Sequence, residues 1–159
     1  MNQTDIIVEL ERSGESVLRQ YDAPEIDLAK SYGPGKWSVR QILAHLADDE
    51  VVSLWRVCRA AAEPGSLVHG FNENAWAAKL HYTERPMPTA KVLFAANRAQ
   101  MIEFLQLLSP TVLDHTIHHS ERGEMTLKSF LESVVWHTWH HLEQIDAARS
   151  GRIWPPQEP

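Results

Sequence analysis

Apolar residues recur every three, four or seven positions over four long stretches of the chain, the spacing that gathers them on one face of an α-helix. This pattern predicts four helices, over residues 4–21, 38–62, 89–108 and 126–149. Ser13 and Gly14 interrupt the apolar face of the first helix, and no stretch shows the alternation of a half-buried strand. We therefore expect an all-α protein whose long helices form a four-helix bundle.

Capping residues mark several ends of these helices. Ser38 and Gln41 have the spacing of a capping box, in which each side chain binds the backbone N–H of the other residue. Thr89 and Thr126 are placed to cap the third and fourth helices, and Gly151 is suited to the left-handed position that ends the last one. The buried face of the second helix is expected to hold Ile42, Leu43, Leu46, Val52, Trp55 and Val57.

The connections between the helices differ in length and composition. Residues 63–88 form the longest, and roughly 25 residues are too many for a featureless loop in a compact domain. Within it, residues 72–80 have helical spacing, which predicts a short extra helix between the second and third long helices. Residues 111–123 form a histidine-rich connection. We expect one domain spanning residues 1–159, with a frayed tail at 152–159.

Charge and composition exclude several classes of protein. With 15 Lys and Arg against 21 Asp and Glu the net charge is −6, which disfavours nucleic acid and anionic membrane surfaces as partners. No uncharged stretch reaches the ~18 residues of a membrane-spanning helix and the N-terminus lacks a secretory signal, so a cytoplasmic protein is expected. The lone Cys58 excludes a disulfide framework, and its distance from His45 along the helix favours a small buried hydrophobe over a nucleophile.

Nine histidines stand out, and three of them are predicted to meet. His137 and His141 continue the apolar face of the last helix, and residues four apart lie about 6 Å from each other, so both imidazoles can reach one metal ion. His45 lies three residues after Ile42 on the inward face of the second helix and supplies a third ligand. The alternative is a set of three buried histidines that are satisfied only by hydrogen bonds.

A three-histidine site leaves coordination positions open, as catalytic sites do. A water or a substrate thiol could be activated there. Imidazole suits several divalent metals, of which we expect nickel or zinc, with iron, cobalt and manganese as other options.

Further residues are candidates for the chemistry around such a metal. Asp49 is about 40° around the helix from His45 and is the best-placed carboxylate, either as a base or to orient a ligand. His119 could reach over the site from its connection and is the second candidate catalytic residue. The alternatives are a solvated Asp49 and a His119 that only forms part of a turn. Arg56 could bind an anionic substrate, although an exposed ion pair is the preferred interpretation.

Several motifs resemble a known family. GKWSVRQILAHLAD at residues 35–48 and WHTWHHLEQI at 136–145 are similar to the second and last helices of the DinB-like superfamily, particularly its YfiT branch. NAW at 74–76 and HSERGEMTL at 119–127 also resemble that branch. The chain departs from the pattern at Ser120, where proline is common, and at Glu50, where close relatives often have histidine.

The resemblance implies a usually dimeric four-helix bundle that holds a divalent metal with three histidines, which map onto His45, His137 and His141. It implies a metal-dependent hydrolase, or an enzyme that transfers a low-molecular-weight thiol such as bacillithiol or mycothiol or uses it as an isomerase cofactor. We therefore expect a homodimer that acts on a small molecule as a hydrolase or thiol S-transferase. The alternatives are a non-catalytic metal-binding or stress-related bundle and a metal-free dimerisation module.

Overall fold

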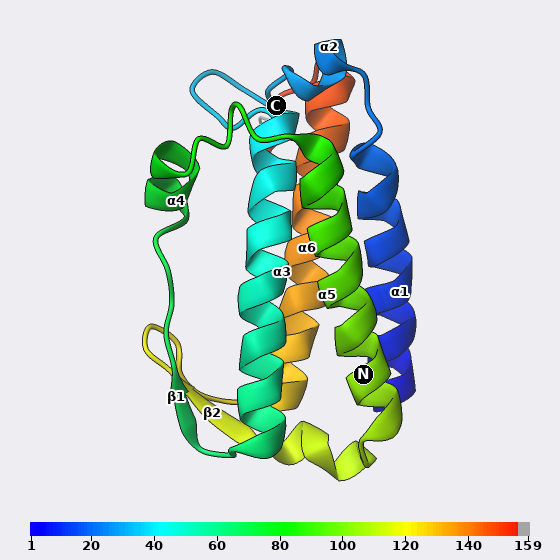
Figure 1. Cartoon of the computed structure of the whole chain (residues 1–159), viewed down its shortest axis with the longest axis vertical. Coiled ribbons are helices and arrows are strands. Elements are labelled where there is room, and N and C mark those ends of the chain that lie inside the picture. The colour runs from blue at the N-terminus through cyan, green and yellow to red at the C-terminus, as the bar shows by residue number, and fades with distance from the viewer. Residues whose placement is uncertain (156–159) are drawn as a thin grey trace.

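Four long helices run side by side in the computed structural model, which describes residues 1–155 (Figure 1). They are α1 (Gln3–Gln20), α3 (Val39–Ala62), α5 (Met87–Leu107) and α6 (Leu127–Arg149). The predicted four-helix bundle is thereby confirmed. Its interior consists of apolar side chains from all four helices that are almost completely removed from solvent, among them Ile6, Leu10, Leu43, Phe94, Met101, Leu131 and Ile145.

The predicted caps are present at the start of two helices. The Ser38 hydroxyl accepts a hydrogen bond from the N–H of Gln41 (3.3 Å), and the Gln41 side chain accepts one from the N–H of Ser38 (2.9 Å). The Thr126 hydroxyl accepts from the N–H of Ser129 (3.1 Å) and starts α6. Gly151 has a φ of 67° just after α6, the left-handed conformation expected there.

Two details of the helices were predicted wrongly. α5 begins at Met87 rather than at Thr89, because Pro86 is its N-cap and Pro88 lies in the first turn, where a missing N–H breaks no helical bond. Trp55 was assigned to the buried face of α3, but 47% of its surface is exposed. Near that end of α3 the buried face runs through the expected Val57 and also through Ser53 and Arg56.

The long connection between α3 and α5 contains α4 (Glu73–Lys79), which confirms the short extra helix. Asn72 caps it by accepting a hydrogen bond from the N–H of Ala75 (2.8 Å). A second short helix, α2 (Glu25–Leu28), joins α1 to α3, and a 3-10 turn spans Pro110–Asp114 after α5. In Figure 1, α4 stands away from the bundle beside α3.

A small three-stranded sheet closes one end of the bundle, and the expectation of no strand is wrong. β1 (Ser66–Val68) pairs in parallel with β2 (Thr116–His119), which pairs antiparallel with β3 (Gly123–Thr126). Each strand has only three or four residues, too few to establish an alternating pattern, and β1 meets its partner only in the folded chain. The sheet turns the histidine-rich connection into a fixed hairpin.

The chain after α6 folds back onto the bundle as far as it is described. The N–H of Arg152 donates to the carbonyl of Ala147 (2.8 Å), and the N–H of Trp154 donates to the carbonyl of Tyr32 (3.0 Å). The Trp154 ring also packs against the ring of His140, with 4.5 Å between ring centroids. Of the tail predicted to be frayed, residues 152–155 make these contacts and 156–159 lie outside the described residues.

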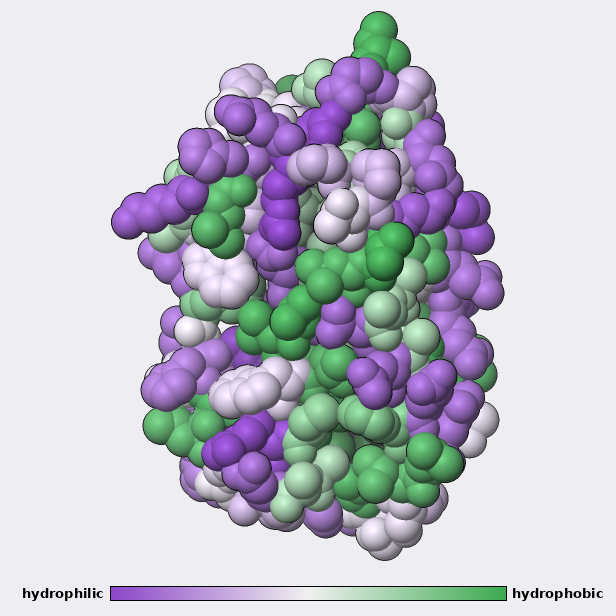
Figure 2. All heavy atoms as spheres, in the orientation of Figure 1, coloured by the Kyte–Doolittle hydropathy of each residue, from purple (hydrophilic) through white to green (hydrophobic). Residues whose placement is uncertain are grey.

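The surface is mixed in character. Figure 2 shows a band of apolar residues across the middle of the face that carries α3 and α5, with hydrophilic residues around it. Large exposed apolar side chains on these two helices include Val51 and Val92. Within residues 1–155, no helix combines the length and the apolar character needed to cross a membrane.

Candidate metal centre

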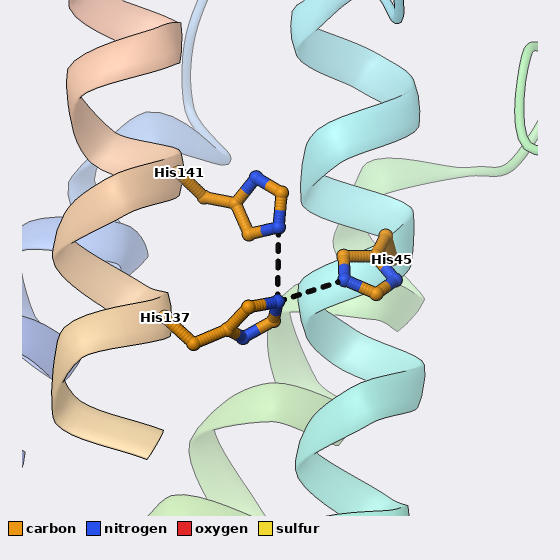
Figure 3. A group of neighbouring side chains, drawn as sticks. All are labelled: His45, His137 and His141. Carbon is orange, nitrogen blue, oxygen red and sulfur yellow. Dashed lines mark hydrogen bonds between the residues drawn. The ribbon is translucent and has the colours of Figure 1, made fainter. Parts of the chain in front are cut away.

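Three imidazoles from two helices meet between α3 and α6. The Nε2 atom of His137 lies 3.2 Å from Nε2 of His45 and 3.0 Å from Nε2 of His141. One nitrogen of each ring lies within 4.8 Å of the other two. Figure 3 shows the His137 and His141 rings projecting from one helix toward the His45 ring on the facing helix. The structure therefore brings together the three residues that the sequence predicted as ligands.

The local sequence explains this convergence. His137 and His141 are four residues apart in α6, so their side chains leave the same face of the helix about one turn apart. His45 lies in the part of α3 where the surrounding residues are buried, and its own exposed fraction is 1%. The packing of α3 against α6 then brings the rings to one point from both sides.

The hydrogen-bond partners of two of these rings fix where their protons lie. Asp49 can only accept, so the contact between its carboxylate and Nδ1 of His137 (3.3 Å) places the His137 proton on Nδ1. The side-chain oxygen of Gln144 lies 2.8 Å from Nδ1 of His141 and accepts its proton in the same way. Both Nε2 atoms therefore present lone pairs, and they face each other at 3.0 Å.

Two lone pairs at this distance repel each other unless a positive charge lies between them. Two nitrogens on one tetrahedral zinc ion are about 3.3 Å apart, given metal–nitrogen bonds of roughly 2.0–2.1 Å. The distances from Nε2 of His137 to the other two rings, 3.2 and 3.0 Å, are close to this separation, so the residues present fit a divalent metal. The alternative of histidines satisfied by hydrogen bonds fits less well, because Nδ1 of His45 is buried with no partner among the described residues.

The surroundings keep the imidazoles of His45 and His141 neutral, which is the form that binds a metal. Burial lowers the pKa of His45 to about 4, despite the opposing attraction of Asp49. Burial also lowers the pKa of His141 well below its ordinary value. The His45 ring is enclosed by the rings of Trp37 and Phe71, at centroid distances of 5.2 Å and 6.3 Å.

Asp49 lies beside the cluster, as its position on α3 predicted. Burial by itself would raise the pKa of Asp49, but the hydrogen bond from His137 and the charges of His137, His45 and Arg56 lower it to about 2. The carboxylate is therefore ionised at neutral pH and is a weak proton acceptor. This geometry favours Asp49 as the residue that orients His137 rather than as a general base.

A cavity of about 240 Å³ opens beside His137 and Asp49. His119 lines it and is only 6% exposed, so the interpretation of His119 as a turn residue is wrong: it is the last residue of β2. Its Nδ1 accepts a hydrogen bond from the N–H of Glu121 (3.3 Å), which leaves the proton on Nε2. Burial, together with Arg56 and Arg122, lowers the pKa of His119.

Two other residues differ from expectation. Arg56 was interpreted as half of an exposed ion pair, but it is 6% exposed, lines the cavity and makes no salt bridge within residues 1–155. Cys58 is half-buried rather than buried, and it does not line this cavity. Burial raises the pKa of the Cys58 thiol, which disfavours the reactive thiolate.

Sequence reasoning missed the residues that support the ligands. Gln144 binds both His141 and Nε2 of His140 (3.0 Å). Its spacing of three from His141 was a usable signal, since residues three apart share a helix face. Phe71 gave no signal, because it reaches His45 from the long connection after α3.

The comparisons with known proteins agree with this site. The sequence profile of the DinB superfamily matches residues 15–145. A protein of Oceanobacillus iheyensis that is named as a candidate metal-dependent hydrolase is 30% identical over 127 residues, which cover 80% of this chain and 73% of that protein.

Two solved structures share the fold. YfiT from Bacillus subtilis, described as a probable metal-dependent hydrolase with an unusual four-helix bundle topology, aligns with a TM-score of 0.86 at 23% identity, over 94% of this chain and 88% of that one. A mycothiol-dependent maleylpyruvate isomerase aligns with a TM-score of 0.73 at 13% identity, over 91% of this chain and 61% of that one. At these identities the likeness concerns the fold alone.

Proposed function

The chain belongs to the DinB superfamily, and we propose that it is an enzyme that acts on a small molecule with a divalent metal ion held by His45, His137 and His141. The observation that carries the proposal is the convergence of the Nε2 atoms of two buried histidines and one half-buried histidine, two of them with lone pairs directed at each other. The name of the Oceanobacillus iheyensis relative supports hydrolysis as the first candidate reaction.

When bound, a divalent ion supplies Lewis acidity, which makes a water or thiol group a better nucleophile at neutral pH. Asp49 holds the proton on Nδ1 of His137 and keeps the ring turned toward the other two. Gln144 does the same for His141. Nickel and zinc are the metals that we propose, because both accept neutral imidazole ligands.

His119 is the candidate hydrogen-bond donor to a substrate in the cavity. With Nδ1 occupied by the N–H of Glu121, its Nε2–H is the group available to a substrate. The lowered pKa keeps the ring neutral at pH 7, so this donor is a neutral imidazole. Asp49 lies on the same cavity wall but holds His137, which leaves His119 as the better candidate to contact a leaving group.

Thiol transfer is the second candidate reaction. It is supported by the shared fold of the mycothiol-dependent isomerase, and by the position of the lone cysteine outside the cavity. A sulfur nucleophile would therefore have to come from a small thiol such as bacillithiol or mycothiol. The same open site would hold that thiol as a thiolate.

The test compares metal-free, zinc-loaded and nickel-loaded protein on two panels: esters and amides for hydrolysis, and thiols paired with electrophiles for transfer. We expect turnover on one panel only when metal is present, and its loss in His45→Gln. The matched control is His118→Gln, because His118 is an exposed residue of β2 outside the cavity. Equal rates with and without metal on both panels would contradict the proposal and favour a non-catalytic metal-binding protein.

The expected homodimer remains a prediction that rests on family resemblance. Sedimentation equilibrium checks it: a mass of two chains agrees with it, and a mass of one chain contradicts it. The expected cytoplasmic location is checked by fractionating cells that express the protein.

A further inference from the structure

Arg56 differs from the other deeply buried arginine of the bundle. Arg98 is 4% exposed, and Glu50 binds its guanidinium through two hydrogen bonds, of 2.6 and 2.8 Å. Arg56 is 6% exposed, yet no carboxylate forms a salt bridge with it in the part of the chain that is described. Its Nε is buried without any hydrogen-bond partner there. Asp49 and Glu121 attract the Arg56 charge from further away, but neither carboxylate lies within salt-bridge distance of the guanidinium. The folded chain therefore keeps a buried cation without a directly bound counterion among the described residues.

The guanidinium of Arg56 is held in place by uncharged groups. Its Nη2 donates to the backbone carbonyl of His69 (2.6 Å). The ring of Phe130 lies 5.9 Å from the guanidinium carbon. These contacts orient the guanidinium but supply no directly bound carboxylate, which leaves it able to bind an anionic ligand.

Arg56 lies in the same cavity as the metal centre. It follows Asp49 by seven residues in α3, which places it two helical turns, or about 10 Å, further along the same face. Both residues line the cavity of about 240 Å³, together with His137. That volume is below the range of roughly 300–1,000 Å³ for drug-sized ligands, so the cavity fits a small molecule.

The other charged groups of the cavity narrow the choice of anion. Arg122 is a second cation on the wall, and its Nη1 donates to the hydroxyl of Ser133 (3.2 Å). Three acidic residues also line the cavity, namely Asp49, Glu73 and Glu121. They would repel a phosphate dianion more strongly than a singly charged carboxylate. The planar fork of a guanidinium also matches a carboxylate well.

A second cavity, of about 290 Å³, lies on the His141 side of the cluster. Lys36 is its only Lys or Arg, and that residue is exposed. Of these two cavities, the one on the His137 side contains the buried arginine without a salt bridge, which favours that cavity as the one for an anionic ligand.

We propose that Arg56 binds the carboxylate of the small molecule whose reactive group reaches the three-histidine centre, with Arg122 as a second cation at the cavity wall. This inference rests on the proposed function, because it assumes that the cavity is the substrate site. It makes Arg56 a specificity-determining residue, with no part in holding the metal.

The test uses two thiols of the same chain length, mercaptohexanoate, which ends in a charged carboxylate, and mercaptohexanol, which ends in a neutral hydroxyl. In cobalt-loaded protein the thiolate of either probe gives an absorption band when it binds the metal, and titration of that band gives the affinity. We expect the wild-type protein to bind the carboxylate roughly tenfold or more tightly than the alcohol. In Arg56→Met the two affinities should become equal, and Arg56→Lys should keep part of the preference.

Arg59→Met is the matched control. Arg59 lies one turn further along α3 and its charge is paired with Glu63 (2.5 Å), so its loss should leave the preference unchanged. Equal binding of the two probes by the wild-type protein would overturn the proposal, and this measurement does not depend on any variant folding.

The same two probes are titrated into metal-free protein by calorimetry, which separates the two proposals. If the metal-free protein prefers the carboxylate and Arg56→Met does not, the anion site is supported. This result would stand even if the protein bound no metal, in which case only the proposed function would be contradicted. If both thiols bind cobalt with equal affinity, the anion site is overturned and the proposed function is not. No preference with or without metal also overturns the anion site.

Discussion

Two buried polar clusters lie side by side in this bundle and differ in how fully they are satisfied. In the first, Arg98 of α5 binds Glu50 of α3, and its Nη1 donates to the carbonyl of Leu10 (2.9 Å) and the hydroxyl of Ser13 (3.1 Å) in α1. Its Nη2 also donates to Thr138 of α6 (3.2 Å). This cluster, which we call the arginine cluster, ties all four long helices together and leaves no charge unpaired.

The second cluster consists of the three histidines together with Asp49, and in both α3 and α6 one of its residues directly precedes a residue of the arginine cluster. Asp49 precedes Glu50, and His137 precedes Thr138. Here the ring nitrogens face one another without a shared partner, and Nδ1 of His45 is unpaired among residues 1–155. The difference distinguishes a structural cluster from a functional one. A buried cluster whose polar groups are all paired stabilises the fold, whereas a cluster with unpaired ligand atoms can bind an external ion or molecule.

The largest expected effect on stability comes from removing the arginine of the arginine cluster. Arg98→Met leaves the Glu50 carboxylate buried without its counterion and should lower the free energy of unfolding by about 3–5 kcal/mol. Chemical denaturation measures this loss. The double variant Arg98→Met, Glu50→Leu removes both charges and should recover most of it. A single variant within about 1 kcal/mol of wild type would show that the arginine cluster is not a stabilising element.

The histidine cluster should make the metal-free protein sensitive to acid. Burial holds the pKa of His45 at about 4, below its ordinary 6.5, so between these values the unfolded chain binds a proton that the folded chain does not. Stability is therefore complete above pH 6.5 and falls as the pH drops toward 4, by about 3 kcal/mol from His45. Denaturation at several pH values checks this, and His45→Gln should flatten the slope. Identical slopes in the two proteins would contradict the assignment.

A smaller effect is expected from the residue that orients the metal ligand. Asp49→Ala removes the acceptor that holds Nδ1 of His137 and should weaken metal binding by about 10–100-fold. Asp49→Asn keeps an oxygen that can accept this proton and should lose less. Competition with a chromophoric chelator measures both affinities. If Asp49→Ala bound metal as tightly as wild type, Asp49 would have no part in orienting the ligand.

The sequence predicted the features that depend on local spacing. The Ser38 cap, the Thr126 cap and the convergence of His137 and His141 all follow from residues within one or two turns of each other. His45 was found because it continues an inward apolar face in a second helix. Such features can be predicted without knowing how distant parts of the chain pack together.

The features that were missed depend on contacts between distant segments. The strands formed by residues 66–68 and 116–119 exist only because the fold brings them together. Arg56 was expected at the surface because charged residues usually are, but segments distant in the sequence pack against it, among them His69 and Phe130. The position of Arg98 did carry a signal, since it lies four residues after Phe94 on the apolar face of α5. Arg98 also explains why Ser13 and Gly14 interrupt the apolar face of α1, because it donates to the Ser13 hydroxyl and its side chain packs against Gly14.

Elemental analysis of the purified protein tests the central claim most directly. We predict about one divalent metal ion per chain in the wild-type protein and in the control His118→Gln. In His45→Ala nearly all of the metal should be lost while the helical content is retained. A wild-type protein that binds no stoichiometric metal after incubation with nickel or zinc, or a His45→Ala variant that binds it as fully as wild type, would contradict it.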